Sequence, residues 1–311
     1  MYQIDFSTPV HVYFIGIGGI SMSGLAKILL EKHFKVSGSD ARQSALTDML
    51  SDRGAHIYLG QRKENITADI DVVVYTSAIH PDNPEFIAMQ ELSIPSLTRA
   101  ELLGEIMRNY ELPVAISGTH GKTTTTSMVS EILLQADTDP TLSIGGILKS
   151  IGGNIRVGHS PYFVTEACEY TNSFLSFFPK IGIILNIEED HLDFFKDIHD
   201  IRSSFRRFAA LLPADGTLII NRTIPDVEEI YEGLPCRVIT FGGKDADYSV
   251  FRIHYDDKGC AEFELQSTGK PPCTFKLSVP GEHNIYNALA AIALADLFAI
   301  PRDKTVKALA G

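Results

Sequence analysis

The sequence predicts an α/β fold, in which helices alternate with the strands of parallel sheets. Twice along the 311 residues, at residues 10–32 and 112–136, a short apolar run ends in a glycine-rich turn and continues into a helical pattern of apolar residues. Residues 247–279 alternate apolar with polar residues instead, which is typical of antiparallel strands. We therefore expect a Rossmann-like domain with a parallel sheet over residues 1–110. A P-loop-type α/β domain with an antiparallel β appendage should follow over residues 111–311.

The composition is that of a globular protein without a nucleic-acid-binding surface. Hydrophobic residues make up 44% of the chain, which is enough for a sizeable core. The formal net charge is −12, and both predicted domains are acidic, so neither carries the basic face that duplex binding requires. The four cysteines form no C-x-x-C pair, and no apolar run reaches the roughly 18 residues of a membrane span. We therefore expect a soluble cytoplasmic protein with no nucleic-acid partner and no membrane contact.

The first glycine-rich turn follows the predicted strand 10–15 and begins at Gly16. It matches the dinucleotide-binding pattern G-x-G-x-x-G, except that Ser21 takes the third glycine position. Asp40 closes the next predicted strand, 34–39, where an acidic residue normally binds a ribose. NAD, FAD and a UDP-sugar all present a pyrophosphate to such a turn, and a purely structural turn is the alternative. The candidate ligand contacts are Gly16, Gly18, Gly19, Ser21, Met22, Ser23, Asp40 and Ser77.

Further pairs of strands and helices complete the first predicted domain. The apolar run 71–76 is typical of a buried strand, and a shorter strand is expected at 94–97. Helical patterns cover residues 83–92 and 99–108. Ser77 follows the strand 71–76, and ligands of open parallel sheets lie beyond the carboxyl ends of the strands.

The second glycine-rich turn, SGTHGKTTT at residues 117–125, is typical of the phosphate-binding loop of ATPases. Its glycines let backbone N–H groups converge on an anion, Lys122 supplies a full positive charge, and the Thr123 hydroxyl can bind the accompanying Mg²⁺. Ile116 stands where the usual pattern has its first glycine, so the loop is shorter. An ordinary turn with a solvated lysine is the alternative. The candidate ATP contacts here are Gly118, Thr119, His120, Gly121, Lys122, Thr123 and Thr124.

Two acidic motifs follow strands of the second domain. Glu166 comes directly after the predicted strand 162–165, and His191 follows the predicted strand 181–187 within NIEEDHLD. Because the carboxyl ends of parallel strands meet at one edge of a sheet, these side chains and Thr123 are expected to converge on one or two Mg²⁺ ions. Without a metal, Glu166 would be a solvated carboxylate at a strand end, and His191 would be a loop histidine bonded to neighbouring carboxylates.

The end of the chain opens an alanine-rich helix at PGEHNIYNALAA. Asn284 and Asn287 lie one helical turn apart, so their carboxamides face one way and could hold an adenine edge, with helix caps as the alternative. The other expected elements of this domain are a glycine-rich loop near the nucleotide at 144–153, a helix at 198–212 and strands at 217–221 and 237–241.

Taken together, these motifs resemble the Mur ligase family of bacterial cell-wall synthesis. The resemblance covers nearly the whole chain and implies a UDP-sugar-binding first domain and an ATP- and Mg²⁺-binding second domain. It implies catalytic roles for Lys122, Glu166 and His191. It also implies that Thr123 and Glu166 bind one Mg²⁺ and His191 a second. Asn284 and Asn287 would hold adenine. The motifs that carry the resemblance are FIGIGGISMSG (14–24), SGSD (37–40), SGTHGKTTT (117–125), TEACEYTNSFL (165–175), NIEEDHLD (186–193) and PGEHNIYNALAA (280–291).

One departure favours the alanine-adding branch of the family. Several members carry a carbamylated lysine in the helix after the histidine, and this chain has no lysine between Lys196 and Lys244. The implied reaction joins L-alanine to UDP-N-acetylmuramate through an acyl phosphate, in peptidoglycan precursor synthesis. Family members also have a third, amino-acid-binding domain that is missing from this sequence, so we expect a truncated chain that is inactive alone.

Other functions stay open. The chain could be the tripeptide-recycling relative that uses the same sugar nucleotide, because the missing domain would choose the amine. It could also be a non-catalytic protein that binds a UDP-sugar and ATP. A nicotinamide-dependent oxidoreductase would suit the first turn with Asp40 but leaves the Gly-Lys-Thr sequence unexplained. The sequence identifies neither the base for the amine nor the oligomeric state.

Overall fold

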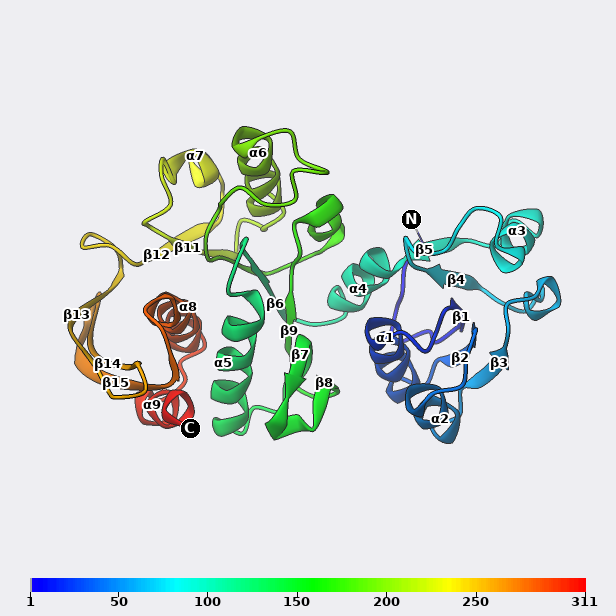
Figure 1. Cartoon of the computed structure of the whole chain (residues 1–311), viewed down its shortest axis with the longest axis horizontal. Helices are drawn as coiled ribbons and strands as arrows, with labels where there is room; N and C mark the ends of the chain where they lie inside the picture. The colour runs from blue at the N-terminus through cyan, green and yellow to red at the C-terminus, as the bar shows by residue number, and fades with distance from the viewer. Residues whose placement is uncertain (1) are drawn as a thin grey trace. The chain divides into compact units, whose positions relative to one another are not determined.

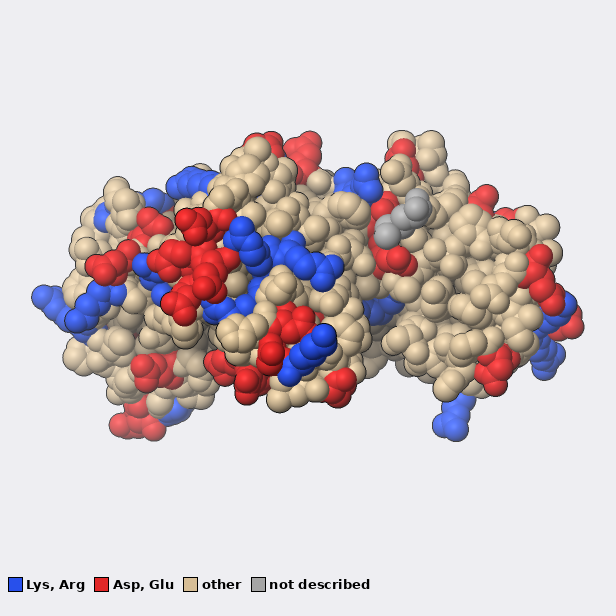
Figure 2. Space-filling model, turned by 90° about the horizontal axis from the view of Figure 1, so that it is seen from above, with Lys and Arg blue, Asp and Glu red and all other residues tan. Residues whose placement is uncertain are grey.

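The structure, a computed structural model, describes residues 2–311, which divide into two compact units, residues 2–109 and 110–311. Each unit has a sheet of its own with helices against it (Figure 1). None of the helices formed by residues 2–311 combines the length and the hydropathy that a membrane crossing requires. Figure 2 shows basic and acidic side chains mixed over the face seen from above.

The first unit is built on a five-stranded sheet in the order β3-β2-β1-β4-β5, with every strand pair parallel. The chain starts at the middle strand, builds one side of the sheet and then crosses to the other, which confirms the predicted Rossmann-like arrangement. The strands are β1 (His11–Ile15), β2 (Lys35–Asp40), β3 (His56–Leu59), β4 (Val72–Tyr75) and β5 (Ser96–Thr98). The helices are α1 (Ile20–Glu31), α2 (Ala45–Asp52), η1 (Lys63–Asn65), α3 (Pro84–Glu91) and α4 (Arg99–Met107).

The second unit is built on a ten-stranded mixed sheet in the order β15-β14-β13-β12-β11-β10-β6-β9-β7-β8. The strands from β12 to β7 in this order pair in parallel, whereas β13, β14 and β15 form the predicted antiparallel appendage. The strands are β6 (Leu112–Ser117), β7 (Thr141–Leu148), β8 (Gly153–Arg156), β9 (Tyr162–Glu166), β10 (Ile181–Ile184), β11 (Thr217–Asn221), β12 (Arg237–Phe241), β13 (Tyr248–Tyr255), β14 (Cys260–Ser267) and β15 (Lys270–Pro280). The helices are α5 (Lys122–Gln135), η2 (Lys149–Ile151), η3 (Tyr170–Ser176), α6 (Ile198–Ala209), α7 (Glu228–Tyr231), α8 (His283–Leu297) and α9 (Arg302–Ala310).

The prediction of a loop at residues 144–153 is wrong. Half of this segment, residues 144–148, belongs to β7, which pairs in parallel with β9 and antiparallel with β8. Its glycines serve a close approach within the sheet, because a Cβ on Gly145 would lie 2.6 Å from Oε2 of Glu166. The segment does lie beside predicted site residues, but as a strand and not as a loop.

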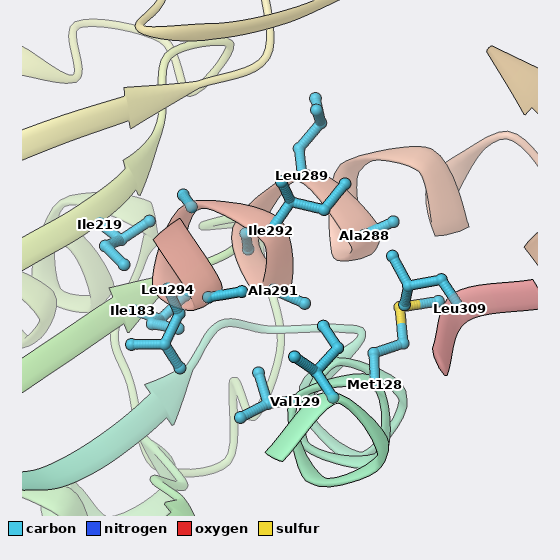
Figure 3. Close-up of a cluster of buried hydrophobic side chains, with 14 of the residues drawn as sticks. Met128, Val129, Ile183, Ile219, Ala288, Leu289, Ala291, Ile292, Leu294 and Leu309 are labelled. Carbon is cyan, nitrogen blue, oxygen red and sulfur yellow. The ribbon is translucent and has the colours of Figure 1, made fainter. Parts of the chain in front are cut away.

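The core of the second unit explains why α8 is rich in alanine. This helix packs against α5 and faces β10 and β11, so most of its side chains are buried (Figure 3). Small side chains let the helices approach closely, while Ile292 and Leu294 supply larger apolar surface. The curved appendage lies beside α8 and α9 in Figure 1, and Phe263 and Phe275 from its strands join the same core. The packing holds α8 next to the glycine-rich turn that begins α5.

The helices that follow the two glycine-rich turns begin differently from four other helices of the chain. Helices α2, α3, α4 and α6 each begin with a side chain that accepts a hydrogen bond from a first-turn N–H. Helices α1 and α5 begin after Gly19 and Gly121 with no such side-chain cap. Their first-turn N–H groups are therefore not satisfied by a capping side chain, which suits binding of an anion.

Candidate functional site

The first glycine-rich turn is fixed to the end of β2. The N–H groups of Gly16 and Ile17 both donate to the carbonyl of Ser39 at 2.9 Å, and the Gly18 N–H donates to Oδ2 of Asp40 at 2.9 Å. A Cβ on Gly18 would lie 2.7 Å from that same oxygen. The structure thus brings Gly16, Gly18 and Asp40 together, with the Asp40 carboxylate bonded to the turn itself.

The other residues predicted to contact the ligand of the first unit differ in burial and in their hydrogen-bond partners. Met22 and Ser23 are buried, and the Ser23 hydroxyl donates to the carbonyl of Ile20, so a ligand contact through these two side chains stays a prediction. Ser21 lies beside Arg99, whose guanidinium donates to the Ser21 hydroxyl at 3.3 Å and brings positive charge to the turn. Ser77 is exposed after β4, and no hydrogen bond joins it to the turn within residues 2–311.

The second glycine-rich turn is held by a neighbouring strand end and by α8. Asn186, just beyond β10, accepts from the N–H of His120 at 2.7 Å and donates to its carbonyl at 3.0 Å. Gly121 has φ of 84°, and a Cβ there would lie 2.5 Å from Oδ1 of Asn287. Gly118 has φ of 147°, and its Cβ would lie 2.9 Å from Cβ of Leu185. Both positions therefore require glycine for conformation as well as for space.

Lys122 lies across the turn and is paired with a buried acid. Its Nζ donates to the carbonyls of Gly118 at 2.5 Å and Thr119 at 3.1 Å, and to Oε2 of Glu169 at 3.0 Å. Only 2% of the Glu169 side chain is exposed. Glu169 was not among the predicted site residues. The sequence feature that could have indicated it is the presence of a second carboxylate shortly after Glu166, at the end of β9.

Thr123 and Glu166 form the predicted pair of oxygen donors. The Thr123 hydroxyl donates to Oε2 of Glu166 at 3.0 Å, and the N–H of Gly145 donates to Oε1 at 2.6 Å. The carboxylate is therefore oriented by β7 as well as by the turn.

The remaining predicted ATP contacts, Thr124 and His120, lie apart from this pair. Thr124 lines a cavity of about 750 Å³ together with residues of β7, β15 and α9. The His120 ring is largely exposed, with Nε2 3.8 Å from Oε2 of Glu188.

The pair of Thr123 and Glu166 fits Mg²⁺. This ion prefers oxygen ligands, keeps several waters, and is usually bound through one or two carboxylates together with the phosphates of a substrate. Within residues 2–311 no group of three or more histidine, cysteine or acidic side chains is arranged to hold a metal, so the arrangement suits an ion that arrives with a phosphate. His191 makes no hydrogen bond to Thr123 or Glu166 within the same residues, and it lies against Tyr170 instead.

Asn284 and Asn287 are bonded to each other. Nδ2 of Asn284 donates to the carbonyl of Pro280 at 2.7 Å, and Nδ2 of Asn287 donates to Oδ1 of Asn284 at 2.9 Å. Both residues are buried, and Asn287 faces Gly121 of the glycine-rich turn. The pair therefore supports the turn in this structure, and its contact with adenine stays a prediction.

Comparisons with known proteins place both units in one family. Residues 116–295 match the Mur ligase middle domain, and residues 11–111 match the Mur ligase family catalytic domain. The chain is similar to the UDP-N-acetylmuramate–L-alanine ligase of Agathobacter rectalis, with 58% identity over 99% of this chain and 68% of the relative. It is 62% identical to the ligase of the same name from Lachnospira eligens, over 94% of this chain and 64% of the relative. The chain thus spans about two thirds of the length of these relatives.

Solved structures share the fold. The UDP-N-acetylmuramate–alanine ligase of Thermotoga maritima superimposes with a TM-score of 0.79 at 29% identity, covering 96% of this chain and 67% of that one. The UDP-N-acetylmuramate:L-alanyl-γ-D-glutamyl-meso-diaminopimelate ligase of Neisseria meningitides gives a TM-score of 0.85 at 28% identity, covering 97% of this chain and 98% of that one.

Proposed function

The chain belongs to the Mur ligase family, and we propose that it serves the ATP-dependent joining of L-alanine to UDP-N-acetylmuramate in peptidoglycan precursor synthesis. The observation that carries the proposal is the 58% identity, over 99% of this chain, to a relative named for that ligation. The reaction is that of a carbon–nitrogen ligase, and the proposal places it in the cytoplasm. A tripeptide amine is the second candidate, because the Neisseria meningitides neighbour named for that substrate shares the fold with a TM-score of 0.85.

The first unit is proposed to bind UDP-N-acetylmuramate. Its support is the turn from Gly16 to Gly19, which is fixed to β2 and leads into α1 without a side-chain cap. Such a helix start favours the pyrophosphate of a sugar nucleotide, because its N–H groups and dipole attract negative charge. Asp40 lies at the turn, where a carboxylate can accept hydrogen bonds from ribose hydroxyls.

The second unit is proposed to bind ATP with Mg²⁺. The turn from Gly118 to Thr124 offers the uncapped start of α5 and the charge of Lys122 to the phosphates. Thr123 and Glu166 would hold the ion, and His191 a second one. Mg²⁺, when bound, neutralises phosphate charge and so favours phosphoryl transfer. Asn284 and Asn287 are the proposed adenine contacts, through polar atoms that their mutual hydrogen bonds leave free.

In the proposed reaction the muramoyl carboxylate attacks the γ-phosphorus of ATP, which releases ADP and gives an acyl phosphate. The amine of L-alanine then displaces phosphate and loses a proton, which leaves the amide. The residues of this chain position and neutralise the reacting groups, as is usual in phosphoryl transfer. Lys122 places positive charge at the phosphates, and Gly145 keeps the Glu166 carboxylate turned toward Thr123.

Calorimetric titration of the chain with nucleotides tests the proposal. We expect saturable binding of UDP-N-acetylmuramate and, independently, of Mg-ATP, and no binding of NADH, because the second turn needs a triphosphate and the first a sugar nucleotide. Binding of NADH without binding of UDP-N-acetylmuramate would contradict the proposal and favour an oxidoreductase. Alanine-dependent phosphate release, measured with the remaining third of a relative added in trans, then distinguishes a ligase from a protein that only binds the two nucleotides.

A further inference from the structure

We propose that Tyr170 is a positioning residue for His191: its ring sets the orientation of the imidazole, and its hydroxyl holds the loop that carries the histidine. The inference rests on the proposed function, in which His191 is a Mg²⁺ ligand. Tyr170 itself touches neither the phosphate-binding turn nor Glu166 through any hydrogen bond within residues 2–311.

Three contacts join Tyr170 to the histidine loop. Its ring lies on that of His191, with ring centroids 4.6 Å apart and planes inclined by 34°. Its hydroxyl donates to Oδ2 of Asp193 at 2.8 Å. Its ring also meets that of Phe194 edge to face at 6.0 Å. A single side chain thus contacts the histidine and two of the three residues that follow it.

Among residues 2–311, His191 has no hydrogen-bonded partner that would fix its ring. Metal-binding histidines are usually oriented by a hydrogen bond from the second ring nitrogen to a carboxylate or a carbonyl. Here the nearest carboxylate oxygen, Oδ1 of Asp190, lies 3.9 Å from Nδ1, beyond hydrogen-bond distance, and it accepts from the backbone N–H of His191 at 2.7 Å. Within residues 2–311 neither ring nitrogen takes part in a hydrogen bond. The ring of Tyr170, tilted against the imidazole, therefore supplies the orientation that a hydrogen bond supplies in other sites.

The backbone on both sides of this contact is constrained. His191 has φ of 51°, and Thr171 and Asn172, directly after Tyr170, have φ of 54° and 57°. Asparagine and histidine adopt the left-handed region more readily than most residues, but a β-branched threonine is strained there, so the conformation of Thr171 persists only because its surroundings enforce it. The carboxamide of Asn172 accepts a hydrogen bond from the Ser204 hydroxyl of α6, which anchors this segment. Tyr170 is thus held on a rigid backbone, as a positioning role requires.

The residue before Tyr170 links this contact to the phosphate-binding turn. Glu169 pairs with Lys122, while Tyr170 packs on His191. Two consecutive residues therefore hold two proposed functional groups that come from different elements. Their adjacency links the placement of the lysine to that of the imidazole.

The test compares Tyr170→Leu, which removes the ring, with Tyr170→Phe, which keeps it. Tyr255→Leu, at an exposed tyrosine of β13, is the matched control. The first measurement is the NMR signal of the His191 Cε1–H, identified by its loss in His191→Gln. We expect Tyr170→Leu to shift it, because the ring current of the tyrosine is lost, and Tyr170→Phe to leave it near its original position.

The second measurement is the affinity for Mn²⁺, in place of Mg²⁺, with ATP present. We expect Tyr170→Leu to weaken Mn²⁺ binding about tenfold, at the low end for loss of an orienting partner, and Tyr170→Phe about two- to threefold. The melting temperature of each variant checks that the fold is retained, and Tyr255→Leu should leave both measurements unchanged.

The outcomes separate the inference from the function on which it rests. Weaker Mn²⁺ binding in both His191→Gln and Tyr170→Leu supports the positioning role. Weaker binding in His191→Gln with unchanged binding in Tyr170→Leu overturns that role and leaves the proposed function standing. Unchanged Mn²⁺ affinity in His191→Gln contradicts the proposed metal role of the histidine, and the positioning role falls with it.

Discussion

Replacement of Lys122 by alanine is expected to weaken Mg-ATP binding while UDP-N-acetylmuramate binding stays unchanged. The lysine lies at the start of α5 and is the fixed cation of the glycine-rich turn, so its removal takes a charge-assisted contact from the phosphates. Such contacts are worth about 1.5–3 kcal/mol, which corresponds to about a tenfold to hundredfold loss of affinity. Isothermal titration calorimetry with each nucleotide measures both effects.

The buried partner of Lys122 calls for a second variant. Alanine at this position leaves the carboxylate of Glu169 unpaired with 2% of its side chain exposed, and breaking a buried pair in this way costs roughly 3–5 kcal/mol of stability. The double variant Lys122→Met and Glu169→Gln removes both charges and keeps the side-chain volumes similar. It should restore the melting temperature but not the ATP affinity. Unchanged ATP affinity in a folded double variant would remove Lys122 from the proposed site.

Replacement of Gly18 by valine is expected to abolish UDP-N-acetylmuramate binding and to spare Mg-ATP. A Cβ at this position would lie 2.7 Å from Oδ2 of Asp40 and 3.0 Å from Cγ2 of Thr47. The valine must therefore displace the carboxylate that holds the turn, and a displaced turn no longer presents its N–H groups to a pyrophosphate. We expect the affinity to fall by about a hundredfold or more, which corresponds to about 2.7 kcal/mol or more of binding free energy.

The Mg-ATP affinity of Gly18→Val is the internal control, because the second glycine-rich turn lies in the other unit. Asp40→Asn, which keeps the size of the side chain and removes its charge, separates the steric effect from the loss of the carboxylate. Equal loss of both nucleotides in Gly18→Val would point to misfolding or to a single shared site, and either result would contradict the proposal.

Local patterns predicted the features that depend on local sequence. Both glycine-rich turns, the parallel sheets and the antiparallel appendage follow from periodicity and from glycine placement, and the structure confirms them. The pairing of Thr123 with Glu166 followed from a simple topological rule, because both lie at the carboxyl ends of neighbouring parallel strands, β6 and β9.

Features that depend on distant residues could not be predicted in this way. The glycines of β7 resemble a loop in the sequence, yet Gly145 is a strand residue whose size is limited by Glu166, 21 positions further on. The same holds for Glu169, whose role appears only because the chain folds it beneath Lys122. The contact of Tyr170 with His191 was likewise not predictable, because it joins two loops and accompanies left-handed backbone at Thr171 and Asn172. Spacing rules describe neighbours along one element and not contacts between elements.

The central claim is that the first unit takes the sugar nucleotide and the second takes ATP. Hydrogen–deuterium exchange of the 311-residue chain, with each nucleotide added separately, tests it most directly, because ligand contact slows exchange of the amides it covers. We predict that UDP-N-acetylmuramate protects residues 16–24 and that Mg-ATP protects residues 117–125. Protection of residues 16–24 by NADH or by ATP, without protection by UDP-N-acetylmuramate, would contradict the account.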